Sequence, residues 1–194
     1  GNYFNDLSLK KQEDFYANEC VSNSKQVVII SDALRYEVAA ELMQELAKEK
    51  HIAKLSAYRA MLPTETKYCK PSLLPHTSLI WKNKEMLVDG EVLDTLESRS
   101  VQVAKYKESA CCVDYETVIK ADVKTARELF KRPLVYIFHD TIDAASHGAG
   151  AGDVIAACRK AIEQLAVLVR RLHASWNVTN VVLTADHGFL YNEG

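Results

Sequence analysis

The sequence predicts an α/β fold, a three-layer sandwich in which a mostly parallel sheet lies between helices. Short runs rich in Val, Ile and Leu at residues 26–31, 133–139 and 178–185 are typical of buried strands. Helical periodicity at 36–50 and 153–173 separates them. Strands that alternate with helices of this length form parallel sheets covered on both faces, and such strands are apolar almost throughout.

The remaining regular elements are predicted from weaker patterns. Residues 51–56 are interpreted as a second strand, and residues 57–79 as a proline-containing loop region. Asp153 is placed to cap the long helix that starts there. Because residues 8–24 are polar and charged and begin with a helix-like pattern, we expect an N-terminal helical extension at 1–24 ahead of a domain at 25–194.

Residues 80–130 are the least regular part of the chain, and we interpret them as an inserted small cap region. Asp89-Gly90 follows the apolar run 86–88 and predicts a tight turn, with residues 91–92 as the other half of a hairpin. Residues 91–98 and 115–130 have short helical patterns.

Composition bounds the class of protein. The 194 residues are 48% hydrophobic and 26% charged, which suffices for one sizeable globular core. The net charge of −2 and the lack of a ~20-residue apolar run argue against a membrane protein, and nucleic acid is expected only as an indirect partner. The five cysteines are odd in number and form no CxxC pair, which predicts a reduced, cytoplasmic protein in which Cys111 and Cys112 are small apolar side chains. A start at Gly1 and an end just after the richest motif indicate a fragment of a longer protein.

Side chains that bind metals follow three of the predicted strands. Parallel strands end at one edge of a sheet, where ligands of open α/β sheets bind. Carboxylate and imidazole ligands together suit zinc or manganese, and five of them exceed the needs of one tetrahedral zinc ion, so two ions are expected. The candidate ligands are Asp32 after the first strand, Asp143 and His147 four residues apart after the third, and Asp186 and His187 before Gly188 after the last.

Each of these residues taken alone has a simpler interpretation. Asp32 alone is typical of a turn or a helix cap, and Asp143 with His147 is typical of a solvated helix start. Thr64 and Thr66 offer hydroxyls that a metal could activate, although threonine in a proline-rich loop is usually a turn residue. His139 could orient a metal ligand or be a hydrogen-bonded core histidine. A phosphatase with Asp32 as nucleophile normally needs a second acid two residues on, where this chain has Leu34.

Several motifs together resemble the PglZ domain of the alkaline phosphatase superfamily, whose members are components of BREX phage-defence systems. The resemblance spans about residues 25–194 and implies an alkaline-phosphatase-like fold. The motifs are Ile30-Ser-Asp-Ala-Leu-Arg-Tyr-Glu37, Leu62-Pro-Thr-Glu-Thr66, Leu73-Leu-Pro-His76, Ile142-Asp-Ala-Ala145 and Thr184-Ala-Asp-His-Gly-Phe-Leu-Tyr191.

The resemblance implies roles for the candidate residues. One zinc ion takes Asp32, Asp186, His187 and the nucleophilic threonine. The other takes Asp143 and His147 with a distant C-terminal histidine, but no histidine follows His187, so that ligand either lies beyond Gly194 or has been dropped.

The implied reaction is hydrolysis of a phosphate monoester or diester through a phosphothreonine. Thr66 is the favoured nucleophile and Thr64 the alternative. Two zinc ions are expected in the full-length protein, with manganese possible, and the expected partners are a phosphorylated substrate of unknown class and other defence-system proteins. The competing hypothesis is a catalytically silent phosphatase-like scaffold within a larger defence complex.

Overall fold

A computed structural model describes residues 10–11, 14–20, 23–35, 44, 54–55, 58–59, 70–140 and 150–185 of the chain. Most of the predicted helix at 36–50 lies outside these residues. No helix in the described ranges combines the length and apolar character needed to cross a membrane.

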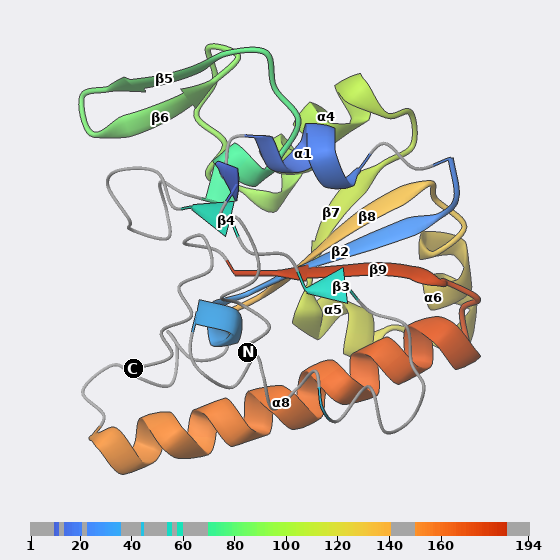
Figure 1. Ribbon diagram of the computed structural model, residues 1–194. Helices are drawn as coiled ribbons and strands as arrows, with labels where there is room; N and C mark the ends of the chain where they lie inside the picture. The colour runs from blue at the N-terminus through green and yellow to red at the C-terminus, as the bar shows by residue number, and fades with distance from the viewer. Residues whose placement is uncertain are drawn as a thin grey trace.

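A five-stranded parallel sheet forms the centre of the described structure, and it confirms the predicted α/β class (Figure 1). The strand order is β3-β9-β2-β8-β7. Its register pairs Ser31 with His139 and Ile30 with Thr184, so β2, β8 and β9 end almost level. The strands are β2 (Gln26–Ser31), β3 (Lys54–Leu55), β7 (Cys111–Asp114), β8 (Leu134–His139) and β9 (Asn180–Thr184).

Both faces of the sheet are buried, each under its own apolar cluster, and side chains of β2 point alternately into the two clusters. Val27 and Ile29 belong to one apolar cluster, and Val28 and Ile30 to the other. All six residues of β2 are buried, which explains the nearly continuous apolar run in the sequence.

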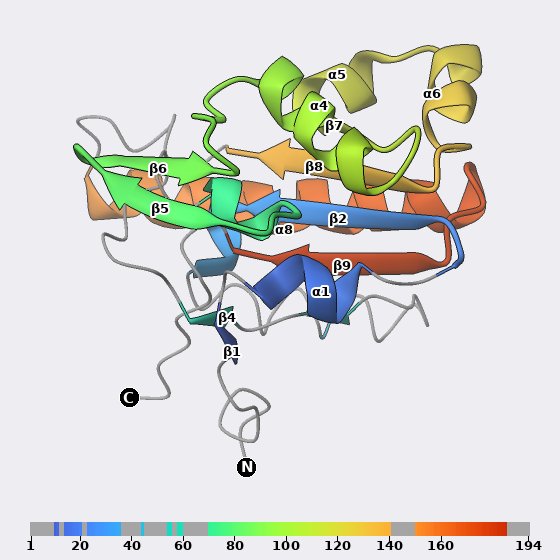
Figure 2. The ribbon, with the colours of Figure 1, turned by 90° about the horizontal axis from the view of Figure 1, so that it is seen from above.

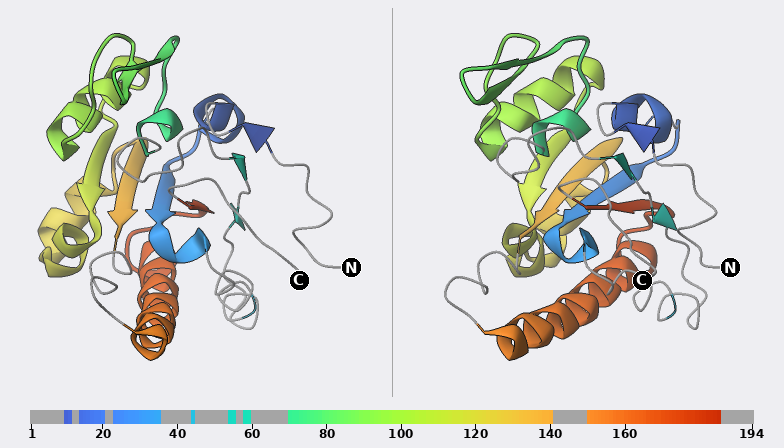
Figure 3. Two further views of the ribbon diagram at one scale, coloured as in Figure 1. Left: turned by 90° about the vertical axis from the view of Figure 1, so that its left-hand side faces the viewer. Right: turned by 60° about the vertical axis from the view of Figure 1, so that its left-hand side comes forward.

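Helices α8 (Ala151–Ala174), α5 (Tyr115–Lys120) and α6 (Val123–Leu129) cover the first face (Figure 3). The long helix α8 contributes a row of buried residues at helical spacing, among them Ala161, Leu165, Leu168 and Leu172. This row is the apolar face predicted from the sequence.

The second face is covered by shorter elements, which makes the three-layer arrangement complete (Figure 2). Tyr136 of β8 fastens two of them to the sheet, because its hydroxyl donates to the Leu73 carbonyl at 2.8 Å and lies 3.6 Å from the Cys20 Sγ. The elements are α1 (Phe15–Glu19), the 3-10 turn η3 (Lys70–Leu73), the hairpin β5 (Leu79–Lys82) and β6 (Glu85–Val88), and α4 (Leu96–Tyr106).

The predicted turn at Asp89-Gly90 is present, with φ of 49° and 83° at the two residues. The predicted pairing across this turn is present only at its first position, where Val88 and Glu91 exchange both backbone hydrogen bonds. Residues 91–92 contribute only one isolated bridge, Val88 with Glu91, while β6 pairs along its length with β5 on its N-terminal side. The apolar content of 86–88 indicated a strand but not which neighbour it would pair with.

The Asp89 carboxylate joins this hairpin to α4. It accepts hydrogen bonds from the backbone of Thr77 and Ser78 and from the side chains of Thr77, Gln102 and Tyr106. Partial burial acts to raise the pKa of Asp89, but these hydrogen bonds, led by that of Tyr106, outweigh it and hold the pKa far below its ordinary value.

The stretch expected to be an insertion, about 80–130, contributes partly to the layer on the second face and partly to the main sheet. Its first part holds β6 and α4 on the second face, whereas β7 is an edge strand of the main sheet and pairs with β8. Cys111 is half-buried and Cys112 buried in β7, and neither forms a disulfide, as expected for small apolar residues. The boundaries at 1–24 and 25–194 stay predictions.

The start of the long helix differs from its prediction. Gly150 occupies the N-cap position, and Asp153 lies in the first turn without capping it. A carboxylate in the first turn still complements the helix dipole, which explains why the residue type signalled a helix start. The two remaining short strands, β1 (Lys10–Lys11) and β4 (Tyr58–Arg59), pair parallel apart from the main sheet.

Candidate active site

Three neighbouring strands, β9, β2 and β8, end at the same edge of the sheet. Asp32 follows β2, Asp140 follows β8, and Ala185 follows β9. Asp32 begins a 3-10 turn, η2 (Asp32–Arg35), and its side chain has no exposed surface. A carboxylate is buried only where a cation or hydrogen bonds compensate its desolvation, so this position suits a metal ligand.

Of the five predicted metal ligands, Asp32 lies within the described residues. Asp143, His147, Asp186 and His187 lie outside them, as do the candidate nucleophiles Thr64 and Thr66. Within the described ranges, no group of three His, Cys, Asp or Glu side chains is placed to hold a metal ion. The shared metal pocket therefore stays a prediction, and the described structure contributes the common edge at which β2, β8 and β9 end.

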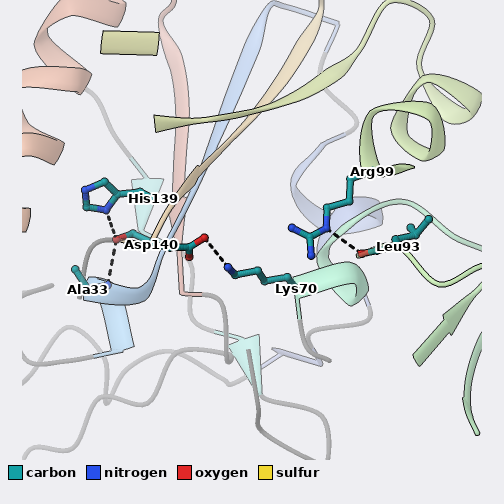
Figure 4. A network of polar contacts seen from close by, with 7 residues as sticks. Ala33, Lys70, Leu93, Arg99, His139 and Asp140 are labelled. Carbon is teal, nitrogen blue, oxygen red and sulfur yellow. Dashed lines mark hydrogen bonds and ion pairs between the residues drawn. The ribbon is translucent and has the colours of Figure 1, made fainter. Parts of the chain in front are cut away.

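His139 forms the best-defined polar network at this edge (Figure 4). Its Nε2 lies 2.8 Å from the Gln164 Oε1, which can only accept, so Nε2 carries the proton of the neutral ring. Its Nδ1 then accepts from the Ser31 hydroxyl at 2.7 Å, and the Ser31 oxygen accepts from the Ala33 backbone N–H at 3.1 Å. Through Ser31, His139 thus fixes the turn that carries Asp32.

Burial favours the neutral form of His139. Loss of solvent lowers the pKa of the imidazole, while the hydrogen bond with Gln164 and the carboxylates of Asp32 and Asp140 act in the opposite direction with smaller effect. The ring also packs edge-on against Tyr115, with centroids 4.7 Å apart. Since both Ser31 and His139 have no exposed surface, the pair cannot act on a substrate as a nucleophile and base.

These contacts make His139 a hydrogen-bonded core histidine, and through Ser31 it also holds the turn of Asp32, so a role in orienting a metal ligand stays a prediction. His76 also has a local structural contact, because its Nδ1 lies 2.7 Å from the Leu74 carbonyl. Ser31 could have been noticed from its position at a strand end, but no sequence signal linked it to a residue 108 positions away.

A basic corner, defined here as Lys70 and Arg99, lies beside this network. The Lys70 ammonium donates to Asp140 at 2.6 Å, and the Arg99 Nε donates to the Leu93 carbonyl at 3.0 Å. Both cations lie over the ring of Phe138, at 5.9 Å for Lys70 and 5.0 Å for Arg99. Sequence reasoning missed both, since one comes from a proline-rich loop and the other from an irregular region without a motif.

Comparison with known proteins identifies the family of the chain. A model of the BREX system PglZ alkaline phosphatase-like domain matches residues 16–194. The chain belongs to this family. The match confirms the resemblance drawn from the sequence motifs and covers every element from within α1 to the end of the chain.

Two curated relatives of the PglZ domain support this assignment. The chain is 32% identical over 198 residues to the alkaline phosphatase-like protein PglZ of Bacillus cereus (strain H3081.97), covering 98% of the chain and 23% of that protein. It is 33% identical over 198 residues to the alkaline phosphatase-like protein BrxZ of Escherichia coli O9:H4 (strain HS), covering 95% of the chain and 22% of that protein. The chain therefore spans less than a quarter of the length of these relatives.

Proposed function

We propose that this PglZ domain belongs to a metal-dependent hydrolase of phosphate monoesters or diesters that acts in BREX phage defence. The observation that carries the proposal is the level ending of β2, β8 and β9 at one edge of the sheet, with the buried Asp32 on the turn after the middle strand of the three. The sequence motifs that contain the other proposed ligands follow β8 and β9. Membership of the PglZ family and the BREX relatives support the same function.

The proposed roles follow the chemistry of the side chains. Asp32, Asp186 and His187 would hold one ion, and Asp143 and His147 would hold the other. Zinc or manganese bound there would stabilise negative charge on the attacking and leaving oxygens. Ser31 and His139 keep the Asp32 turn in place, and the buried neutral imidazole adds no positive charge that would repel a cation.

The nucleophile in this proposal is Thr66, with Thr64 as the alternative. The threonine oxygen attacks phosphorus as its hydroxyl proton is lost, and the ester alcohol leaves with its oxygen and gains a proton. Water then cleaves the phosphothreonine, which restores the hydroxyl and releases phosphate or a phosphomonoester. Each step conserves the atoms of ester and water and needs no redox partner.

The test uses the full-length protein, its metal content and the hydrolysis of p-nitrophenyl phosphate and bis-p-nitrophenyl phosphate. Asp32→Asn should release metal and lower turnover at least about 100-fold, because removal of a direct ligand exceeds the effect of changing a residue behind it. Asp153→Asn, an exposed carboxylate on α8, is the matched control and should leave both values unchanged. A metal-free wild-type protein that cleaves neither ester would instead favour the silent scaffold within a defence complex.

A further inference from the structure

We infer that Lys70 and Arg99 form a subsite for a second, non-reacting phosphate of the substrate, so that the substrate carries at least two phosphates. This inference rests on the proposed function, because the subsite is defined relative to the phosphate that reacts. Its basis is the convergence of two cations from separate elements, η3 and α4, on the ring of Phe138 near the end of β8.

Arg99 has hydrogen-bonding capacity that the described protein does not use. Its Nε donates to the Leu93 carbonyl, which fixes the plane of the guanidinium, and no described residue accepts a hydrogen bond from its two terminal nitrogens. The side chain is half-buried, and among the described residues it forms no ion pair. Four N–H groups in a fixed fork are therefore not used by any residue that the structure describes, and this geometry matches two oxygens of a phosphate.

Lys70 provides the second charge. Its ammonium has three donors, and the described structure uses one of them on Asp140. The lysine side chain is 10% exposed and that of Asp140 is 38% exposed, so the ion pair meets solvent on the Asp140 side. A phosphate bound there would take the remaining donors without requiring the ion pair to break.

The basic corner lies next to the candidate active site. Asp140 directly follows His139, which pairs with Ser31, the residue before Asp32. The carboxylates of Asp32 and Asp140 both act on the His139 imidazole, and Asp140 also acts on Arg99. In Figure 4 the Asp140 carboxylate lies between His139 and the basic corner, and Lys70 reaches toward it from η3.

A purely structural role explains these two cations less completely. Lys70 alone would neutralise Asp140, and nothing in that role requires a second cation over the same ring. Burial lowers the pKa of Arg99, so placing the guanidinium here disfavours its charged form, and the carboxylates of Asp140 and Asp94 only partly offset this effect. A bound phosphate would provide the missing negative charge.

The experiment measures binding of three probes to the full-length protein by isothermal titration calorimetry. Methylphosphonate carries one phosphoryl group, methylenediphosphonate carries two joined by one atom, and the dinucleotide pTpT carries two separated by a sugar. For at least one of the two-phosphate probes, Arg99→Gln should weaken binding roughly tenfold or more, as expected for loss of a charge-assisted contact, with methylphosphonate affinity unchanged. The preferred probe distinguishes a polyphosphate from a nucleotide chain.

Arg127→Gln is the matched control, because Arg127 is an exposed arginine on α6, which leads into the opposite end of β8. Arg99→Lys keeps a cation over Phe138 should the glutamine variant fold poorly, and its loss should be intermediate. Lys70→Gln should reproduce the selective loss, with the exposed Lys124→Gln as its control.

The outcomes separate this inference from the proposed function. A wild-type protein that binds no two-phosphate probe, or variants that weaken all three probes equally, would overturn the inference even if p-nitrophenyl phosphate is hydrolysed. Selective loss in a protein without hydrolytic activity would support the second-phosphate subsite and count against the proposed catalysis.

Discussion

The buried network around His139 leads to a prediction about stability. His139→Leu keeps a side chain of similar size but removes both ring nitrogens. The Ser31 hydroxyl, which has no exposed surface, would lose its acceptor, whereas Gln164 is half-buried and can turn to water. Leaving one buried hydroxyl without an acceptor lowers the free energy of unfolding by about 1–3 kcal/mol. Loss of the aromatic contact with Tyr115 lowers it by about 0.5–1.5 kcal/mol.

The free energy of unfolding of His139→Leu should therefore fall by about 3 kcal/mol, and Tm by about 6–12 °C for a chain of this length. Urea and thermal unfolding followed by tryptophan fluorescence measure both, since Trp176 stacks on Phe130 with centroids 4.9 Å apart at the first-face core. His76→Leu is the control: it removes one hydrogen bond from a half-buried histidine and should cost about 1 kcal/mol.

A double-mutant cycle with Ser31→Ala tests the mechanism rather than the size of the effect. Because the double variant strands no hydroxyl, the two changes should show a coupling of about 1–2 kcal/mol. Costs that add within about 0.5 kcal/mol would refute the direct hydrogen bond between Ser31 and His139 as the source of the stability.

Two further predictions concern the hairpin and its turn. Asp89→Asn should lower the free energy of unfolding at neutral pH, because its single amide oxygen cannot serve both the donors of Thr77 and Ser78 and those of Gln102 and Tyr106. Since the folded pKa is depressed, the difference from wild type should persist down to about pH 4 and shrink as pH falls further. Urea titrations at several pH values check this, and a difference that grows below pH 4 would contradict the sign. Gly90→Ala should cost about 1–2 kcal/mol because φ is +83° there, although a Cβ would meet no atom within 4 Å. Gly150→Ala, at an ordinary φ of −79° in equally open space, should cost clearly less, and equal losses in thermal melts would remove backbone strain as the explanation.

The sequence predicted those parts of the candidate site that follow from the local chain. A strand pattern ending at Asp32 or His139 is visible in a few adjacent residues, and the order of strands and helices then brings those ends to one edge. The Ser31–His139–Gln164 network and the basic corner could not be predicted this way. Their partners are far apart in the chain, and a serine or lysine outside a motif carries no signal of what it will contact.

By itself, the sequence determined the α/β class, the buried strands β2, β8 and β9, the long helix α8 and membership of the PglZ family. Periodicity and motif content are properties of residues near one another in the chain, so they can be recognised without knowledge of the fold. The tertiary structure alone decided that β7 joins the sheet, that β6 pairs with β5, and that Lys70 and Arg99 meet over Phe138. These outcomes depend on which apolar surfaces pack together across the whole chain, and that choice is not encoded in any single segment.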